Sequence, residues 1–154
     1  MRDNTLHLYE RVVGYAPTTS GDVTRNSSSF ADLDVLTFPV ASGKNYTFIF
    51  VCSWEHSSTS GGPVFSFNHP GGTVRALFEY TGESSSISDT RDYVNSSDTG
   101  SGVATVDTGG ASRMCIGHGR YTCTSSGTFA MRYARNTTGT LTVHAGASLF
   151  VTSD

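Results

Sequence analysis

Two Asp-Thr-Gly sequences, at 98–100 and 107–109, are the stretches of this chain that come closest to a known catalytic motif. In aspartic proteases an Asp-Thr-Gly loop that follows an apolar strand holds one of two carboxylates that share a proton. Here the first copy follows a polar run, and the two copies lie too close together to belong to two symmetric halves. We interpret both as turns and expect no enzymatic activity. A protease that uses Asp107 remains the alternative from another function class.

The cysteines and histidines are the next candidates, as ligands of a metal ion. Cys115 and His118 are three positions apart, so their side chains would point to opposite faces of a strand. Cys123 is a third candidate ligand, but no fourth lies at a spacing that suits zinc. Together with Cys52 the cysteines are odd in number and without paired spacing, which argues against a disulfide framework. We expect no metal and no other cofactor, and we interpret the thiols as core side chains.

The element that must position the rest of the chain is the aromatic and β-branched run 46–54, which contains no Gly or Pro. Its alternation predicts a central strand, because successive side chains of a strand point to opposite faces. One face is the predicted core, and the other, with Thr47, Ile49 and Val51, is expected to be at least partly covered. The predicted core residues of this strand are Tyr46, Phe48, Phe50 and Trp54.

The remaining chain reads as a series of short strands separated by Gly, Pro, Ser and Asn turns. With 17 Gly, 9 Phe and 7 Tyr, and few clusters of helix formers, nothing favours a helix longer than a turn or two. The pattern predicts one all-β domain, a jelly-roll-like antiparallel β-sandwich with an extended N-terminal arm. The sandwich is expected over 21–154, and its further strands at 35–38 (ending before Pro39), 64–68, 73–81, 128–134, 141–145 and 147–151, with weaker ones at 22–26, around Tyr93, at 103–106 and at 113–124.

The first 20 residues differ from the rest and are interpreted as the arm. They are too apolar for a free tail, while Gly14, Pro17 and Gly21 keep them from packing as a continuous element of the sandwich. The arm therefore needs a partner surface, unless it is an ordinary first strand. Its predicted contact residues are Arg2, Leu6, Leu8, Tyr9, Arg11, Val12, Val13 and Tyr15.

Charge and hydropathy argue against two classes of partner. The net charge is −3, and Lys44 is the only lysine beside nine arginines, so there is no basic footprint for a nucleic acid. No window approaches a membrane span, and the N-terminus lacks the apolar stretch of a signal peptide. We expect no nucleic acid, no membrane, and synthesis in the cytoplasm.

The order of several blocks resembles a module that recurs in structural proteins of tailed bacteriophages. The blocks are TRNSSSFADL at 24–33, LTFPV at 36–40, GKNYTF at 43–48, VFSFN at 64–68, GTFAMRYA at 127–134 and VHAGAS at 143–148. The resemblance implies a virion surface protein with a sandwich of the trimeric tumour-necrosis-factor and C1q style. It implies a homotrimer that binds the major capsid protein on the outside of the head, made in the cytoplasm of the host bacterium. No catalytic residues are carried over.

The expected function is therefore that of a capsid decoration, or cement, protein that trimerises on the outer surface of a tailed-phage head and stabilises it. Abundant aromatic and Arg side chains with little Lys suit a protein that buries surface against its own copies, around a three-fold axis. The alternative is a receptor- or glycan-binding domain of a tail or head fibre. In that case Trp54, at a strand end beside a Ser-Gly loop, would be the residue to stack on a sugar ring.

Overall fold

The predicted central strand corresponds to β3 (Asn45–His56), which has hydrogen-bonded neighbours on both sides. On one side it pairs with β7 (Arg113–Cys123) from Asn45 to Trp54. On the other it pairs first with β10 (Ser148–Ser153) and then with β9 (Leu141–Val143). The computed structural model describes residues 18–58, 61–82, 90–96, 112–136 and 138–154.

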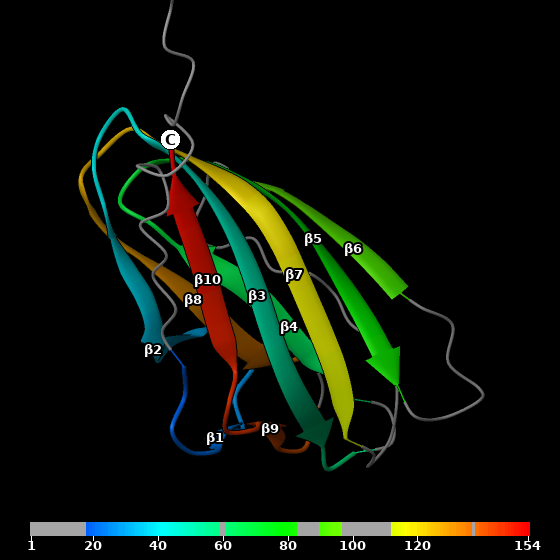
Figure 1. Cartoon of the computed structure of the whole chain (residues 1–154). Helices are drawn as coiled ribbons and strands as arrows, with labels where there is room; N and C mark the ends of the chain where they lie inside the picture. The colour runs from blue at the N-terminus through cyan, green and yellow to red at the C-terminus, as the bar shows by residue number, and fades with distance from the viewer. Residues whose placement is uncertain (1–17, 59–60, 83–89, 97–111, 137) are drawn as a thin grey trace, which may run out of the picture.

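These strands belong to a seven-stranded sheet that lies in front of a three-stranded sheet in Figure 1. The larger sheet continues through β5 (Gly72–Gly82) to β6 (Thr90–Ser96) at one edge, and through β9 to β1 (Val23–Arg25) at the other. The smaller sheet has the order β2, β8, β4, with these bounds: β2 (Ala31–Val40), β8 (Gly127–Arg135) and β4 (Pro63–Asn68).

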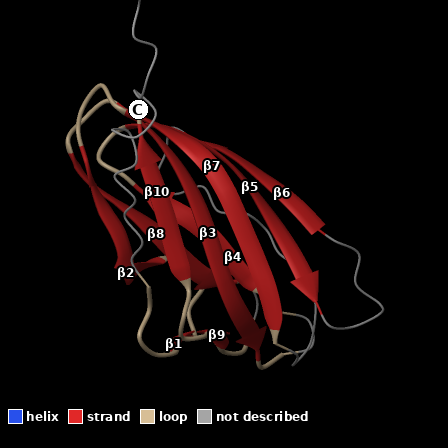
Figure 2. Cartoon of the chain, in the orientation of Figure 1, coloured by secondary structure: helices blue, strands red, loops and turns tan. Residues whose placement is uncertain are grey.

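Every strand pair is antiparallel, and the chain passes from one sheet to the other between β1 and β2, β2 and β3, β3 and β4, β4 and β5, β7 and β8, and β8 and β9. Among the described residues all regular structure is strand (Figure 2), and they contain no helix that is long and apolar enough to cross a membrane. The predicted jelly-roll-like antiparallel β-sandwich is confirmed.

One strand boundary differs from the sequence prediction. Pro39 was expected to follow a strand, because proline has no N–H to donate to a ladder. In the structure it lies inside β2, opposite Thr128 of β8. β2 is at the edge of its sheet and pairs with β8 alone. The N–H groups along its unpaired edge have no partner strand, so proline is tolerated there.

The same strand contains a bulge that simple alternation did not predict. The register with β8 shifts between Asp32 and Thr37, so residues 33–36 of β2 lie opposite Met131 alone. The bulge lets Leu33 and Leu36 both reach the core, where they are 1% and 0% exposed. It also turns Val35 outward. Bulges of this kind bend an edge strand and limit further pairing along it.

The core between the two sheets is a network of aromatic rings. Phe50 of β3 contacts Phe65 of β4 edge-on, with ring centroids 5.0 Å apart, and it also contacts Phe78 of β5. Phe48 contacts Phe67 and Phe129 at 5.2 and 5.5 Å between ring centroids. The β3 side chains thus reach both the opposite sheet and their own neighbours.

Two glycines of β7 make room for these rings. Gly117 and Gly119 occupy positions whose side chains would point into the core. A Cβ atom on Gly117 would lie 2.5 Å from the ring of Phe78, and one on Gly119 would lie 2.6 Å from the ring of Phe48. Carbon atoms in contact normally stay 3.5 to 4.0 Å apart, so the absence of a side chain at both positions is what allows the two phenylalanines to pack against β7.

Some sequence predictions fall outside the described residues. They are the arm before Thr18, with all eight of its predicted contact residues, the strand at 103–106 and both Asp-Thr-Gly sequences. The last three residues of the predicted arm are described, and they contact the sandwich. The N–H of Thr19 donates to the carbonyl of Ala147 at 2.9 Å, and the hydroxyl groups of Thr18 and Ser148 lie 2.9 Å apart.

Candidate functional site

The outward face of the seven-stranded sheet carries apolar side chains, although polar side chains are usual on a sheet face in contact with water. Among the described residues, Ile49, Met114, Ile116 and Phe150 are between 40% and 49% exposed. They come from β3, β7 and β10, and strand register places them together. We call the outward side chains Ile49, Val51, Leu77, Met114, Ile116 and Phe150 the apolar row.

The register makes this surface continuous across four strands. Phe150 of β10 is opposite Ile49 of β3, which is opposite His118 of β7, which in turn is opposite Leu77 of β5. Two positions further along, Ile116 of β7 is opposite Val51 of β3. Side chains opposite one another on the same face of a sheet lie about 5 Å apart, so these groups form one patch.

The second face of the central strand is partly exposed in the described part of the chain. Ile49 is 46% exposed, whereas Val51, Ser53 and Glu55 on the same face are half-buried. The strands β10, β3, β7, β5 and β6 contain 6, 12, 11, 11 and 7 residues, which at about 4.8 Å spacing and about 3.3 Å rise give a face of about 750 Å². Each partner of a stable protein interface typically contributes about 800 Å². The face is therefore large enough for a specific protein contact.

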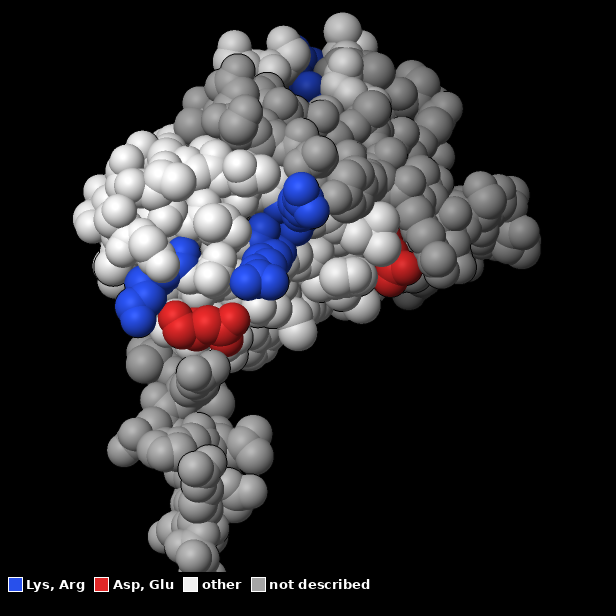
Figure 3. Space-filling model, turned by 90° about the horizontal axis from the view of Figure 1, so that it is seen from above, with Lys and Arg blue, Asp and Glu red and all other residues white. Residues whose placement is uncertain are grey.

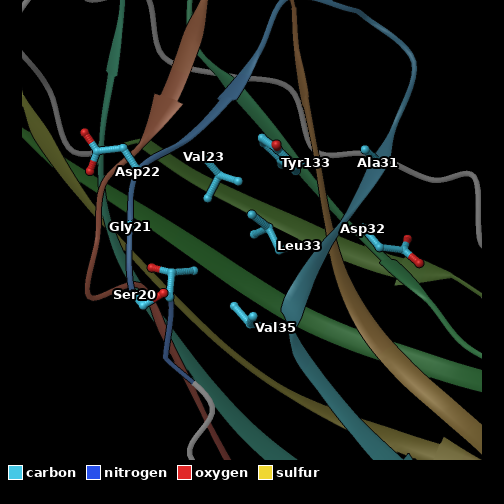
Figure 4. A pocket seen from close by; sticks show the side chains of 10 residues that line it. Ser20, Gly21, Asp22, Val23, Ala31, Asp32, Leu33, Val35 and Tyr133 are labelled. Atoms are coloured by element: carbon cyan, nitrogen blue, oxygen red, sulfur yellow. The ribbon is translucent and has the colours of Figure 1, made fainter.

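A second feature is a hollow of about 480 Å³ between the segment that leads into β1 and the edge strand β2. Figure 4 shows Val23, Leu33 and Val35 facing it, while the carboxylates of Asp22 and Asp32 point away at either side. Its full lining is Thr19, Ser20, Gly21, Asp22, Val23, Ala31, Asp32, Leu33, Val35 and Tyr133.

The two carboxylates beside this hollow have partners in the protein. The N–H of Ala145 donates to Asp22 at 2.8 Å, and this hydrogen bond, together with His144, lowers the pKa of Asp22 below its ordinary 3.8. Asp32 forms an ion pair with Arg132 at 3.1 Å and accepts a hydrogen bond from Asn68. Both groups thus tie the β1 and β2 segments to the sandwich, which is a structural role.

The predicted core residues of the central strand lie where the sequence placed them. Tyr46 is 8% exposed, and Phe48, Phe50 and Trp54 are fully buried. The ring of Trp54 packs edge-on against Tyr80. Trp54 is therefore a core residue and is not available to stack on a sugar ring.

The candidate metal ligands do not converge. Cys115 is buried on the inner face of β7, while His118 is exposed on the outer face. Over the part of the chain that the structure describes, no group of three or more His, Cys, Asp or Glu side chains is arranged to hold a metal ion.

The cysteine thiols are core groups, and two of them are neighbours. Cys52 and Cys115 are register partners on β3 and β7, and all three cysteines are free and buried. Burial raises the pKa of the Cys115 thiol well above its ordinary 9.0, and a hydrogen bond with Cys52 adds to the effect. Burial likewise raises the pKa of the Tyr121 hydroxyl well above 10.0. Both groups stay protonated at neutral pH, so the Cys115 thiol is a poor nucleophile.

These raised pKa values predict that alkaline pH destabilises the fold. A group whose pKa is higher in the folded state stabilises that state fully below its unfolded pKa and loses this contribution as pH rises. We expect the free energy of unfolding to fall above about pH 9, by up to about 1.4 kcal/mol per pH unit for Cys115, with a further loss from Tyr121 above about pH 10. Urea titrations at a series of pH values measure the slope.

The matched control for this prediction is Cys115→Ser, whose hydroxyl is similar in size and does not ionise in this range. Its free energy of unfolding should vary less steeply between pH 9 and pH 10, the ordinary values of the two groups. An unchanged slope in the variant would show that Cys115 does not titrate differently in the folded and unfolded states.

Comparisons with known proteins place the chain in no family. No family model matches it, and no curated protein matches it. Among solved structures it is similar to the Eiger TNF of S. frugiperda, with 8% identity and a TM-score of 0.44, over 90% of each chain. It is also similar to the VP2 subviral particle of infectious bursal disease virus, with 11% identity and a TM-score of 0.24, over 91% of this chain and 40% of that one. At these low TM-scores the fold assignment rests on strand order and register alone.

The sequence predicted a partly covered second face for 46–54 but did not identify the apolar row as a site. The available signal was that strands 46–54, 113–124 and 147–151 carry apolar residues on both faces, whereas a strand with one face in water alternates with polar residues. That signal indicates a second covered face, and only the strand order shows that the strands in question are neighbours.

Proposed function

We propose that this chain is a non-enzymatic structural protein of a virus particle. It associates with two further copies through the outward face of the seven-stranded sheet, and the homotrimer decorates and stabilises the outer surface of a tailed-phage head. The observation that supports self-association is the apolar row, which spans four neighbouring strands and is open to solvent in a single chain. Contiguous apolar patches of this kind mark protein interaction sites.

The composition of the face supports a contact between like copies. It combines Met114 and the aromatic Phe150 with the apolar Ile49 and Ile116. Aromatic, Met and Arg side chains are enriched in interfaces while Lys and Glu are depleted. Three copies, rather than two, and the phage capsid as the partner are taken from the resemblance of the block order to trimeric phage surface modules.

The test introduces a charge into the apolar row. Ile49→Asp and Ile116→Asp, made separately, should each weaken self-association by more than about 100-fold, since a carboxylate would have to be buried without a partner in every interface. Both side chains point outward, so the melting temperature of the single chain should change little. Sedimentation equilibrium at micromolar concentration should show three times the mass of one chain for the wild type and a single-chain mass for both variants.

Thr128→Asp is the matched control, because Thr128 is an exposed residue of the smaller sheet and receives the same charge. It should sediment like the wild type. A monomeric wild type, both in solution and on particles, would overturn the proposal, and so would trimers that persist in both Asp variants.

A further inference from the structure

Two arginines lie directly opposite each other at the end of the larger sheet where β5 begins and β7 ends. Arg75 of β5 is the register partner of Arg120 of β7, and Thr73 is the partner of Thr122 two positions away. The four side chains line one hollow of about 350 Å³ on the outward face. From above, Lys and Arg side chains lie on the surface at this end of the molecule with an acidic side chain beside them (Figure 3).

Such a pair is electrostatically unfavourable unless something neutralises it. Like charges directly opposite each other on neighbouring strands destabilise a sheet. In the described part of the chain, neither Arg75 nor Arg120 takes part in an ion pair.

Among the described residues, the strand positions directly beside the pair carry no carboxylate. The cross-strand neighbours of the pair are Thr47 on β3 and Asn95 on β6, which are uncharged. Glu79 lies four residues further along β5, about 13 Å away at the rise of a strand. Asp154 lies beside Asn45 of β3, the strand next to β7, where its N–H donates to the Asn45 carbonyl, and it forms no ion pair with Arg120.

The donors in the hollow match an oxyanion of two negative charges. A guanidinium presents a planar fork of N–H groups that binds two oxygens of a phosphate or sulfate. The hydroxyl of Thr122 lines the hollow and donates its proton to the side-chain oxygen of Asn45 at 3.0 Å, so it is not a donor to a ligand. The hydroxyl of Thr73 also lines the hollow and supplies a further donor. The hollow has room for such a group together with part of a molecule that carries it.

We propose that Arg75 and Arg120, with Thr73, form a binding site for a phosphate or sulfate group. The site uses the charge of both arginines, so it requires the two residues together. It goes beyond the proposed self-association and does not depend on it, because its residues come from one chain.

The probe is inorganic phosphate, titrated in dilute buffer and followed by calorimetry and by the melting temperature. The wild type should bind one phosphate per chain saturably, and its melting temperature should rise with phosphate, since a ligand that binds only the folded state stabilises it. Arg75→Gln and Arg120→Gln should each lose at least about tenfold in affinity. Lys44→Gln removes an equal charge at the same end of the sheet and should bind like the wild type.

A second measurement separates a built site from general attraction between charges. Without phosphate, Arg75→Gln and Arg120→Gln should melt at a higher temperature than the wild type, because each removes the repulsion within the pair. A phosphate monoester in place of inorganic phosphate tells whether the group is taken free or as part of a larger molecule. Saturable phosphate binding by Ile116→Asp as well would show that the site does not require self-association.

Three results would overturn the proposal. One is a wild type that shows no saturable binding of phosphate or of the monoester. Another is equal affinity in the wild type and both arginine variants. The third is a loss of phosphate affinity in Lys44→Gln as large as that in Arg120→Gln, which would show that net charge alone accounts for the binding.

Discussion

Phe50→Ala should lower the free energy of unfolding by about 3 to 5 kcal/mol, because it removes a fully buried ring and leaves a cavity that its neighbours cannot fill. The ring of Phe50 contacts Phe65 of the opposite sheet and Phe78 of its own, so both sheets lose packing at once. Phe48→Ala should have an effect of similar size for the same reason. Since a domain of this size is stable by only about 5 to 15 kcal/mol, either variant should be close to unfolding. Urea unfolding followed by tryptophan fluorescence gives the difference.

Phe150→Ala is the matched control, with the same change of side chain on the neighbouring strand. Phe150 is 49% exposed on the outward face, so its loss should cost the single chain far less, and should show instead as weaker self-association. Melting of Phe50→Ala within a few degrees of the wild type would contradict the central place of β3 in the core.

Deleting residues 1–17 should abolish binding to phage heads that lack the protein while leaving folding and self-association intact. The contacts of Thr18 and Thr19 with Ala147 and Ser148 remain in such a chain, so the sandwich keeps its described hydrogen bonds. The deleted segment carries Leu6, Leu8 and Tyr9, whose burial would supply several kcal/mol at about 25 cal/mol per Å². Three arms on one trimer would multiply this effect through avidity. Co-sedimentation with bare heads measures the loss.

A full-length variant with Leu6→Ser and Leu8→Ser serves as the control for chain length. It should lose most of the binding as well, because the apolar contact is removed while the arm stays. Binding of the truncated chain at wild-type affinity would show that attachment resides in the sandwich. The arm would then be only the segment that leads into the first strand of the sandwich.

The sequence alone was sufficient for the inner faces of the strands. Alternation in 46–54 placed Phe48 and Phe50 in the core, and both are fully buried. This works because a strand's period of two is a local property, so a few consecutive residues reveal which face is apolar. The number and order of such strands were enough to indicate an antiparallel sandwich.

Local deviations from that period were not readable in the same way. The bulge at 33–36 brings Leu33 and Leu36 to the same side although they are three positions apart. Gly117 and Gly119 looked like weak points of a strand, since glycine has no side chain to pack. Their purpose depends on Phe48 and Phe78, which come from other strands.

The apolar row and the arginine pair could be identified only from the tertiary structure. Ile49, Ile116 and Phe150 become one patch, and Arg75 meets Arg120 across 45 positions of sequence, only because β10, β3, β7 and β5 are adjacent in that order. Alternation tells which way a side chain points but carries no information about the next strand in the sheet. Turns and crossing connections permit many strand orders, and the one adopted is set by the packing of the whole core.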